Sequence, residues 1–82
     1  MEIVNIIDVY RGVINHVESF VISEKTNPIT RSEIIDKAEN LFKVFALEFG
    51  ADKDDLDYWL ERGSYDNENG KEVIINWSNI NI

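Results

Sequence analysis

The sequence predicts an α+β domain that is mainly helical: an antiparallel pair of long amphipathic helices, a short third helix, and a C-terminal β-hairpin or single strand. Two observations favour the helical pair, because two long stretches repeat apolar residues at intervals of three and four. A third observation places β structure at the end, where β-branched and aromatic residues are concentrated. At 82 residues we expect one modest core and a single domain spanning 1–82.

The first helix is predicted over about residues 2–23. Its β-branched residues and Gly12, which costs about 1 kcal/mol relative to alanine, weaken the intrinsic preference for helix, so burial must hold it. Asn27-Pro28 would end it, because proline disfavours helical geometry in the preceding residue. The apolar stripe comprises Ile3, Ile6, Ile7, Tyr10, Val13, Ile14, Val17, Phe20 and Val21.

The second helix is predicted over about residues 31–49. Thr30 and Glu33 match a capping box, with Ser32 as a competing cap, and Gly50 is typical of a residue just past a helix end. The short polar link between the two stripes favours an antiparallel hairpin that forms most of the core.

The third helix is predicted over about 53–62, with Asp52 as its N-cap, and the β segment over about 64–82. Asn69-Gly70 is typical of a two-residue hairpin turn, which would place Tyr65 opposite Ile74. The alternation of residues 78–82 favours a strand that extends to an edge or pairs with a partner.

The charge is strongly negative: sixteen acidic and eight basic residues give −8. This disfavours direct binding to nucleic acid or to an anionic membrane, and favours a protein partner with a basic surface, such as a nucleic-acid-binding enzyme. Nine carboxylates lie from Glu48 to Glu72, with aromatic residues among them. This composition is suited to binding the lysine and arginine side chains of a partner through ion pairs and cation–π contacts. The predicted partner-binding residues are Asp54, Asp55, Asp57, Tyr58, Glu61, Tyr65, Asp66 and Glu68.

The alternative interpretation of the acidic stretch is that Asp52–Asp57 cap and solubilise a helix start while Trp59 belongs to the core. A calcium loop at Asp66–Gly70 is disfavoured, because the EF-hand spacing would put Tyr65 and Asn76 at ligand positions. His16 is the only histidine and cysteine is absent, so we expect no metal site, no cofactor and no catalytic residues.

The leading functional hypothesis is a small non-enzymatic inhibitor or adaptor, of the kind represented by phage anti-defence proteins that mimic DNA, acting in the (host) cytoplasm. The alternatives are an assembly component that forms a homo-oligomer, and an immunity or antitoxin protein. Apolar residues outside the two stripes have two interpretations. They form a second interface, such as that of a homodimer, or they face the β segment of the same chain. No signal peptide or membrane-spanning run is expected. These surplus apolar residues are Val4, Val9, Ile22, Val44 and Leu47.

Overall fold

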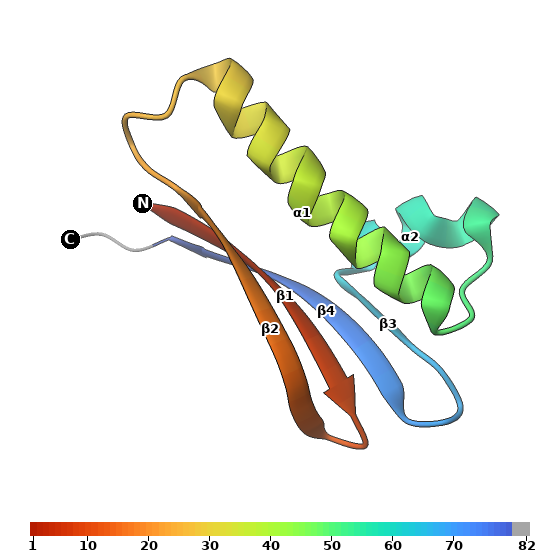
Figure 1. Cartoon of the computed structure of the whole chain (residues 1–82). Coiled ribbons are helices and arrows are strands. Elements are labelled where there is room, and N and C mark those ends of the chain that lie inside the picture. Colours follow the sequence, from red (N-terminus) through yellow and green to blue (C-terminus); the bar gives the residue numbers. More distant parts are fainter. Residues whose placement is uncertain (80–82) are drawn as a thin grey trace.

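A computed structural model describes residues 1–79 as a four-stranded antiparallel sheet with its helices on one face (Figure 1). About 39% of the described residues are in helices and 39% in strands, so the prediction of a mainly helical fold built on a helical hairpin is wrong. The sheet order is β2-β1-β4-β3. The elements are β1 (Glu2–Tyr10), β2 (Val13–Ile22), α1 (Pro28–Glu48), the 3₁₀ turn η1 (Lys53–Asp55), α2 (Leu56–Arg62), β3 (Ser64–Asp66) and β4 (Lys71–Asn79).

The predicted helix over 2–23 is instead the β1–β2 hairpin. Its two-residue turn is Arg11-Gly12, and both residues have positive φ, as hairpin turns of this length require. The helical spacing in the sequence arises because both faces of the strands carry apolar residues. Ile3 and Ile7 lie on one face and Val4 and Ile6 on the other, and the two sets together resemble a period of three to four.

Replacing Gly12 distinguishes the predicted helix from the observed hairpin, because the change in stability has the opposite sign in each. In a helix, Gly12→Ala would add stability, whereas at φ +81° a Cβ costs about 1–2 kcal/mol. A Cβ added at this glycine would meet no atom within 4 Å, so the cost is confined to the backbone. We expect Gly12→Ala to lower the free energy of unfolding in urea by about 1 kcal/mol. Gly12→Asn serves as the control and should lose less, because asparagine tolerates this conformation; a more stable Gly12→Ala variant would contradict the hairpin.

The second predicted helix is confirmed as α1, but its start differs. Asn27 is the N-cap and its Oδ1 accepts a hydrogen bond from the amide of Thr30 at 2.9 Å, so the predicted Thr30 and Ser32 caps are wrong. Pro28 occupies the first turn, where its missing N–H costs nothing. The prediction that Asn27-Pro28 ends a helix is wrong for the same reason, because this pair begins one.

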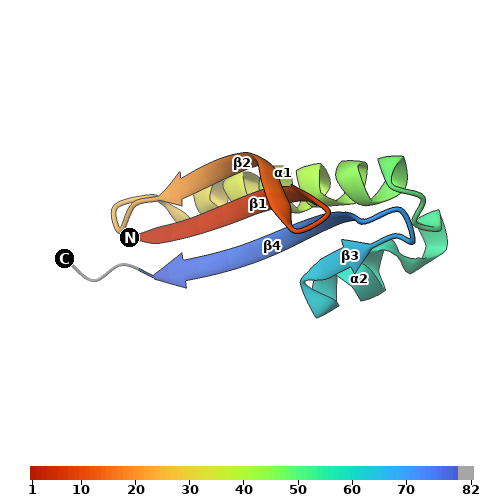
Figure 2. The same ribbon diagram turned by 90° about the horizontal axis from the view of Figure 1, so that it is seen from below.

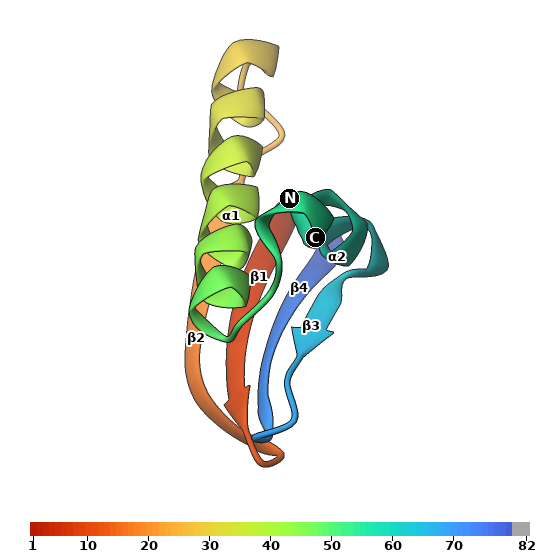
Figure 3. The same cartoon turned by 90° about the vertical axis from the view of Figure 1, so that its right-hand side faces the viewer.

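The core lies between α1 and the covered face of the sheet (Figure 3). Ala38, Phe42 and Ala46 are buried along one side of the helix. The small alanines allow α1 to approach the strands closely, and Phe42 fills the space between them. The strands contribute Val4, Ile6, Ile22, Val73 and Ile75 to the same cluster.

The C-terminal half largely follows the sequence prediction. The third helix is present as η1 and α2, Asp52 caps η1, and Gly63 ends α2 in the left-handed conformation. The hairpin forms, but Tyr65 lies opposite Val73 and not Ile74. The predicted register is off by one because Asn67–Gly70 form the turn and Gly70, at φ +86°, takes the extra position. The predicted strand over 80–82 lies outside the described residues.

The opposite face of the sheet carries no helix within residues 1–79 (Figure 2). Strand alternation directs Ile3, Asn5 and Ile7 of β1 to this open face. The surplus apolar residues outside the predicted helical stripes therefore divide. Val4, Val9 and Ile22 are buried in strands, whereas Val44 and Leu47 are exposed on α1.

Candidate functional site

Five of the eight predicted partner-binding residues lie together on the helix side of the molecule. Asp54 and Asp55 belong to η1, and Asp57, Tyr58 and Glu61 follow on α2. All five are exposed. We call them the helix-side acidic patch.

The other three residues do not join this patch. Tyr65 and Asp66 are neighbours on β3, so their side chains point to opposite faces of the sheet. Tyr65 contacts Trp59 on the helix side, which leaves Asp66 on the open face. Glu68 lies in the turn between β3 and β4. The acidic second half of the chain is thus divided between two sides of the molecule.

The aromatic residues among the acids form a row. The Trp59 ring lies 4.9 Å from that of Tyr58 and 5.1 Å from that of Tyr65, both edge-on. Trp59 and Tyr65 are half-buried against the core, as the alternative interpretation of Trp59 expected, whereas Tyr58 is 61% exposed. Tyr58 is the aromatic residue of the row that is open to a partner.

Few carboxylates of this acidic half are neutralised within the chain. Among its carboxylates in the described residues, Asp57 is the one that forms an ion pair, with the Nζ of Lys43 at 3.0 Å. Asp52 is used as a cap, its Oδ1 accepting from the amide of Asp54 at 2.8 Å. Two of the three cations of this half lie over rings: the Arg62 guanidinium over Trp59 and the Lys71 ammonium over Phe49. The third, Lys53, is exposed on η1. Asp54, Asp55 and Glu61 therefore keep their negative potential toward solvent.

A like-charged pair occupies the open face near the hairpin turn. Asp66 lies directly opposite Glu72 across β3 and β4. The amide of Ile75 donates to the carbonyl of Gly63, so odd-numbered residues of β4 direct their backbone toward β3, and Asp66–Glu72 is a non-hydrogen-bonded pair. Side chains are closest in such pairs, and like charges there are destabilising. Sequence reasoning did not select Glu72, because only the register reveals its partner.

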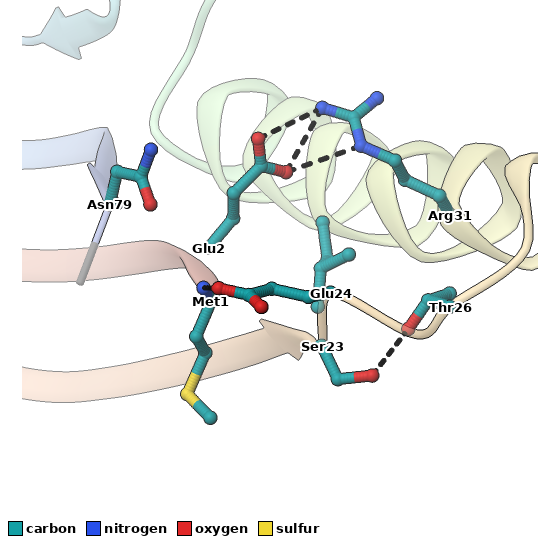
Figure 4. A pocket seen from close by; sticks show the side chains of 8 residues that line it. Met1, Glu2, Ser23, Glu24, Thr26, Arg31 and Asn79 are labelled. Carbon is teal, nitrogen blue, oxygen red and sulfur yellow. Dashed lines mark hydrogen bonds and ion pairs between the residues drawn. The ribbon is translucent and has the colours of Figure 1, made fainter. Parts of the chain in front are cut away.

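A hollow of about 280 Å³ lies at the far end of the sheet (Figure 4). The Arg31 guanidinium crosses it to the Glu2 carboxylate, with nitrogen–oxygen distances of 3.0 to 3.3 Å. The Ser23 and Thr26 hydroxyls lie 3.0 Å apart and the N-terminal amine lies 3.4 Å from Glu24. These groups bind one another, so the hollow joins β1, β2 and α1, and the described residues that line it present no unpaired charge to a ligand.

A second, more open hollow of about 460 Å³ lies between the two hairpin turns and is partly lined by Glu68. The amide of Arg11 donates to the carbonyl of Gly70 at 2.7 Å and ties the turns together. This contact positions Glu68 beside Arg11 and away from the helix-side acidic patch.

Within residues 1–79, no three histidine, cysteine or carboxylate side chains gather in a way that suits a metal ion. His16 is exposed on β2, where its Nε2 lies 3.9 Å from a Glu18 oxygen. None of the described helices has the length and apolar character needed to cross a membrane.

Comparison with protein-family models, curated proteins and solved structures finds no significant match.

Proposed function

We propose that the chain is a non-enzymatic binding protein that docks the helix-side acidic patch onto a basic surface of a larger protein. The observation that carries this proposal is the surplus of carboxylates over cations: among the described residues, Asp54, Asp55 and Glu61 are exposed and form no ion pair. Of the three cations in this half, Arg62 and Lys71 lie over aromatic rings and Lys53 is exposed on η1. Exposed Tyr58 adds a ring able to contact an arginine or lysine of the partner.

A nucleic-acid-binding groove is the complement we favour. Such grooves are lined with arginine and lysine to hold phosphates, and the carboxylates on η1 and α2 would replace phosphates as anionic ligands. If the chain occupies the groove, it acts as an inhibitor of that protein. If it binds the basic surface without blocking the groove, it acts as an adaptor. The Asp66–Glu72 pair extends the negative field around the sheet edge and costs stability in the free chain, which a cationic contact would offset.

The test compares two triple variants that change the net charge equally. Asp54→Asn, Asp55→Asn and Glu61→Gln neutralise the patch but leave the Asp57–Lys43 pair intact. Glu33→Gln, Asp36→Asn and Glu39→Gln neutralise three carboxylates on α1. Each chain is immobilised on a resin and incubated with a lysate of the cells that produce it. The proteins retained on the resin are quantified during elution with rising salt.

We expect the native chain and the α1 variant to retain the same basic nucleic-acid-binding protein, released by salt or by competing DNA. The patch variant should lose at least about tenfold in affinity for it, or ~1.4 kcal/mol. Equal retention by the patch variant, or no retained basic protein, contradicts the proposal. Circular dichroism of the variants excludes unfolding as the cause.

A further inference from the structure

Within residues 1–79, the outer edge of β2 is a long unpaired strand edge. β2 is the last strand on its side of the sheet and spans ten residues, whereas β3 on the opposite edge has three. Natural edge strands are commonly protected by shortness, lysine or proline, and β2 contains neither residue. Its register shift leaves Asn15 as an extra residue near the turn, so residues 16–22 form a regular strand.

The hydrogen bonds of the neighbouring strands show which groups point outward. The Arg11 amide donates to Gly70, so odd-numbered residues of β1 direct their backbone toward β4 and even-numbered residues toward β2. The even-numbered residues pair with residues 16, 18, 20 and 22 of β2. The N–H and C=O groups of Val17, Ser19 and Val21 therefore point away from the sheet.

The same three residues continue a striped pattern on the open face. Ser19 lies beside Asn5 and Asn76, and its hydroxyl donates to the Asn5 Oδ1 at 2.6 Å, so this row is polar and uncharged. The row on one side is apolar, where Val17 lies beside Ile7 and Ile74. In the row on the other side Val21 lies beside Ile3, and Ser78 follows on β4. Val17 and Val21 are 45% and 52% exposed, large fractions for valines in a strand.

We propose that β2 is a homodimer interface in which two copies pair antiparallel about a two-fold axis at Ser19. Val17 of each copy then lies opposite Val21 of the other, and Ser19 lies opposite its own copy. The outward backbone groups become hydrogen-bonded pairs, and apolar residues lie beside apolar residues across the interface while the polar row continues through the axis. The four-stranded sheets become one sheet of eight strands with both helix layers on the same side.

Two neighbouring registers are disfavoured by residues of β2 itself. An axis at Glu18 sets this carboxylate opposite its own copy in a non-hydrogen-bonded pair, where side chains are closest. An axis at Val17 brings Ser19 against Asn15, where the bulge interrupts the ladder. The axis at Ser19 uses the whole regular segment, which is why we assign it.

The dependence of binding on salt concentration distinguishes the dimer interface from the helix-side acidic patch. Each copy carries −8, so screening should strengthen the dimer while it weakens docking of the patch onto a basic protein. The two proposals therefore fail independently.

The first experiment measures mass by light scattering and sedimentation from micromolar to millimolar concentration at moderate salt. We expect the native chain to approach twice its 9.5 kDa mass as concentration rises. Val17→Lys with Val21→Lys should lose the dimer, because lysines then face each other twice. Val44→Lys with Leu47→Lys is the matched control, since these α1 residues are 50% and 45% exposed and the charge change is equal; it should still dimerise.

The second experiment tests the register. Val17→Glu with Val21→Lys places a glutamate of each copy opposite a lysine of the other and should restore the dimer. An axis at Val17 would instead set two glutamates together and give no rescue. A native chain that stays monomeric at millimolar concentration overturns the proposal and leaves the edge to a strand of another protein. A dimer that survives the two lysines places the interface elsewhere and overturns it equally.

Discussion

Phe42→Ala should remove a large part of the stability of the folded chain. Phe42 is the largest fully buried side chain, and it lies in the cluster shared by α1, β1 and β4. Truncating a buried phenylalanine typically costs about 3–5 kcal/mol through lost transfer energy and the cavity that remains. Small domains have only about 5–15 kcal/mol in total, so we expect Phe42→Ala to lose a large fraction of the free energy of unfolding.

Urea unfolding followed by circular dichroism measures this loss. Phe42→Leu keeps much of the volume and should fold with a smaller loss, of about 1–2 kcal/mol, so a value is obtained even if the alanine variant fails to fold. Val44→Ala lies on the same helix but is 50% exposed, and should change stability by less than about 0.5 kcal/mol. A loss below about 1 kcal/mol for Phe42→Ala would show that α1 does not pack on the sheet as described.

Asn67→Ala should give the second largest loss. The Oδ1 of Asn67 accepts hydrogen bonds from the amides of Asn69 and Lys71, at 2.9 and 3.1 Å, and its Nδ2 donates to the carbonyl of Phe49 at 2.9 Å. One side chain thus shapes the β3–β4 turn and ties it to the end of α1. At roughly 0.5–1.5 kcal/mol per hydrogen bond, we expect a loss of about 2–3 kcal/mol in the free energy of unfolding.

Asn67→Asp resolves the two roles of this residue. The carboxylate still accepts from both amides but cannot donate to Phe49, and it places a negative charge near the C-terminal end of α1, which the helix dipole disfavours. We expect a loss of about 1–3 kcal/mol. Asn69→Ala is the control, because the bond at Asn69 comes from its backbone amide. If Asn67→Ala and Asn69→Ala have equal stability, the side chain of Asn67 does not hold the turn.

The sequence predicts the second half of the fold better than the first. α1 and α2 are recognisable because each presents one apolar face and is followed by glycine, and neither signal depends on distant residues. The first 23 residues mislead because the β1–β2 hairpin carries apolar side chains on both faces, which hides the period of two. The remaining local signal is Arg11-Gly12, and a single glycine does not distinguish a turn from a weakened helix.

The candidate site was predictable in composition but not in arrangement. Counting charges finds the acidic half, whereas the opposite faces of Tyr65 and Asp66 follow only from the strand assignment at β3. The Asp57–Lys43 ion pair joins α2 to α1, and the Asp66–Glu72 pair depends on the bulged turn at Gly70. These relations are set by tertiary packing and register, for which the sequence contains no local signal.

The position of β1 and β4 in the sheet has a consequence for folding. These adjacent central strands come from opposite ends of the described chain, and Glu2 pairs with Asn79. Each hairpin and α1 can form from local contacts, but the centre of the sheet requires closure of nearly the whole chain, which is entropically slow. During synthesis β4 is made after the β1–β2 hairpin and α1, so the edge of β1 that pairs with β4 stays unpaired until β4 is made.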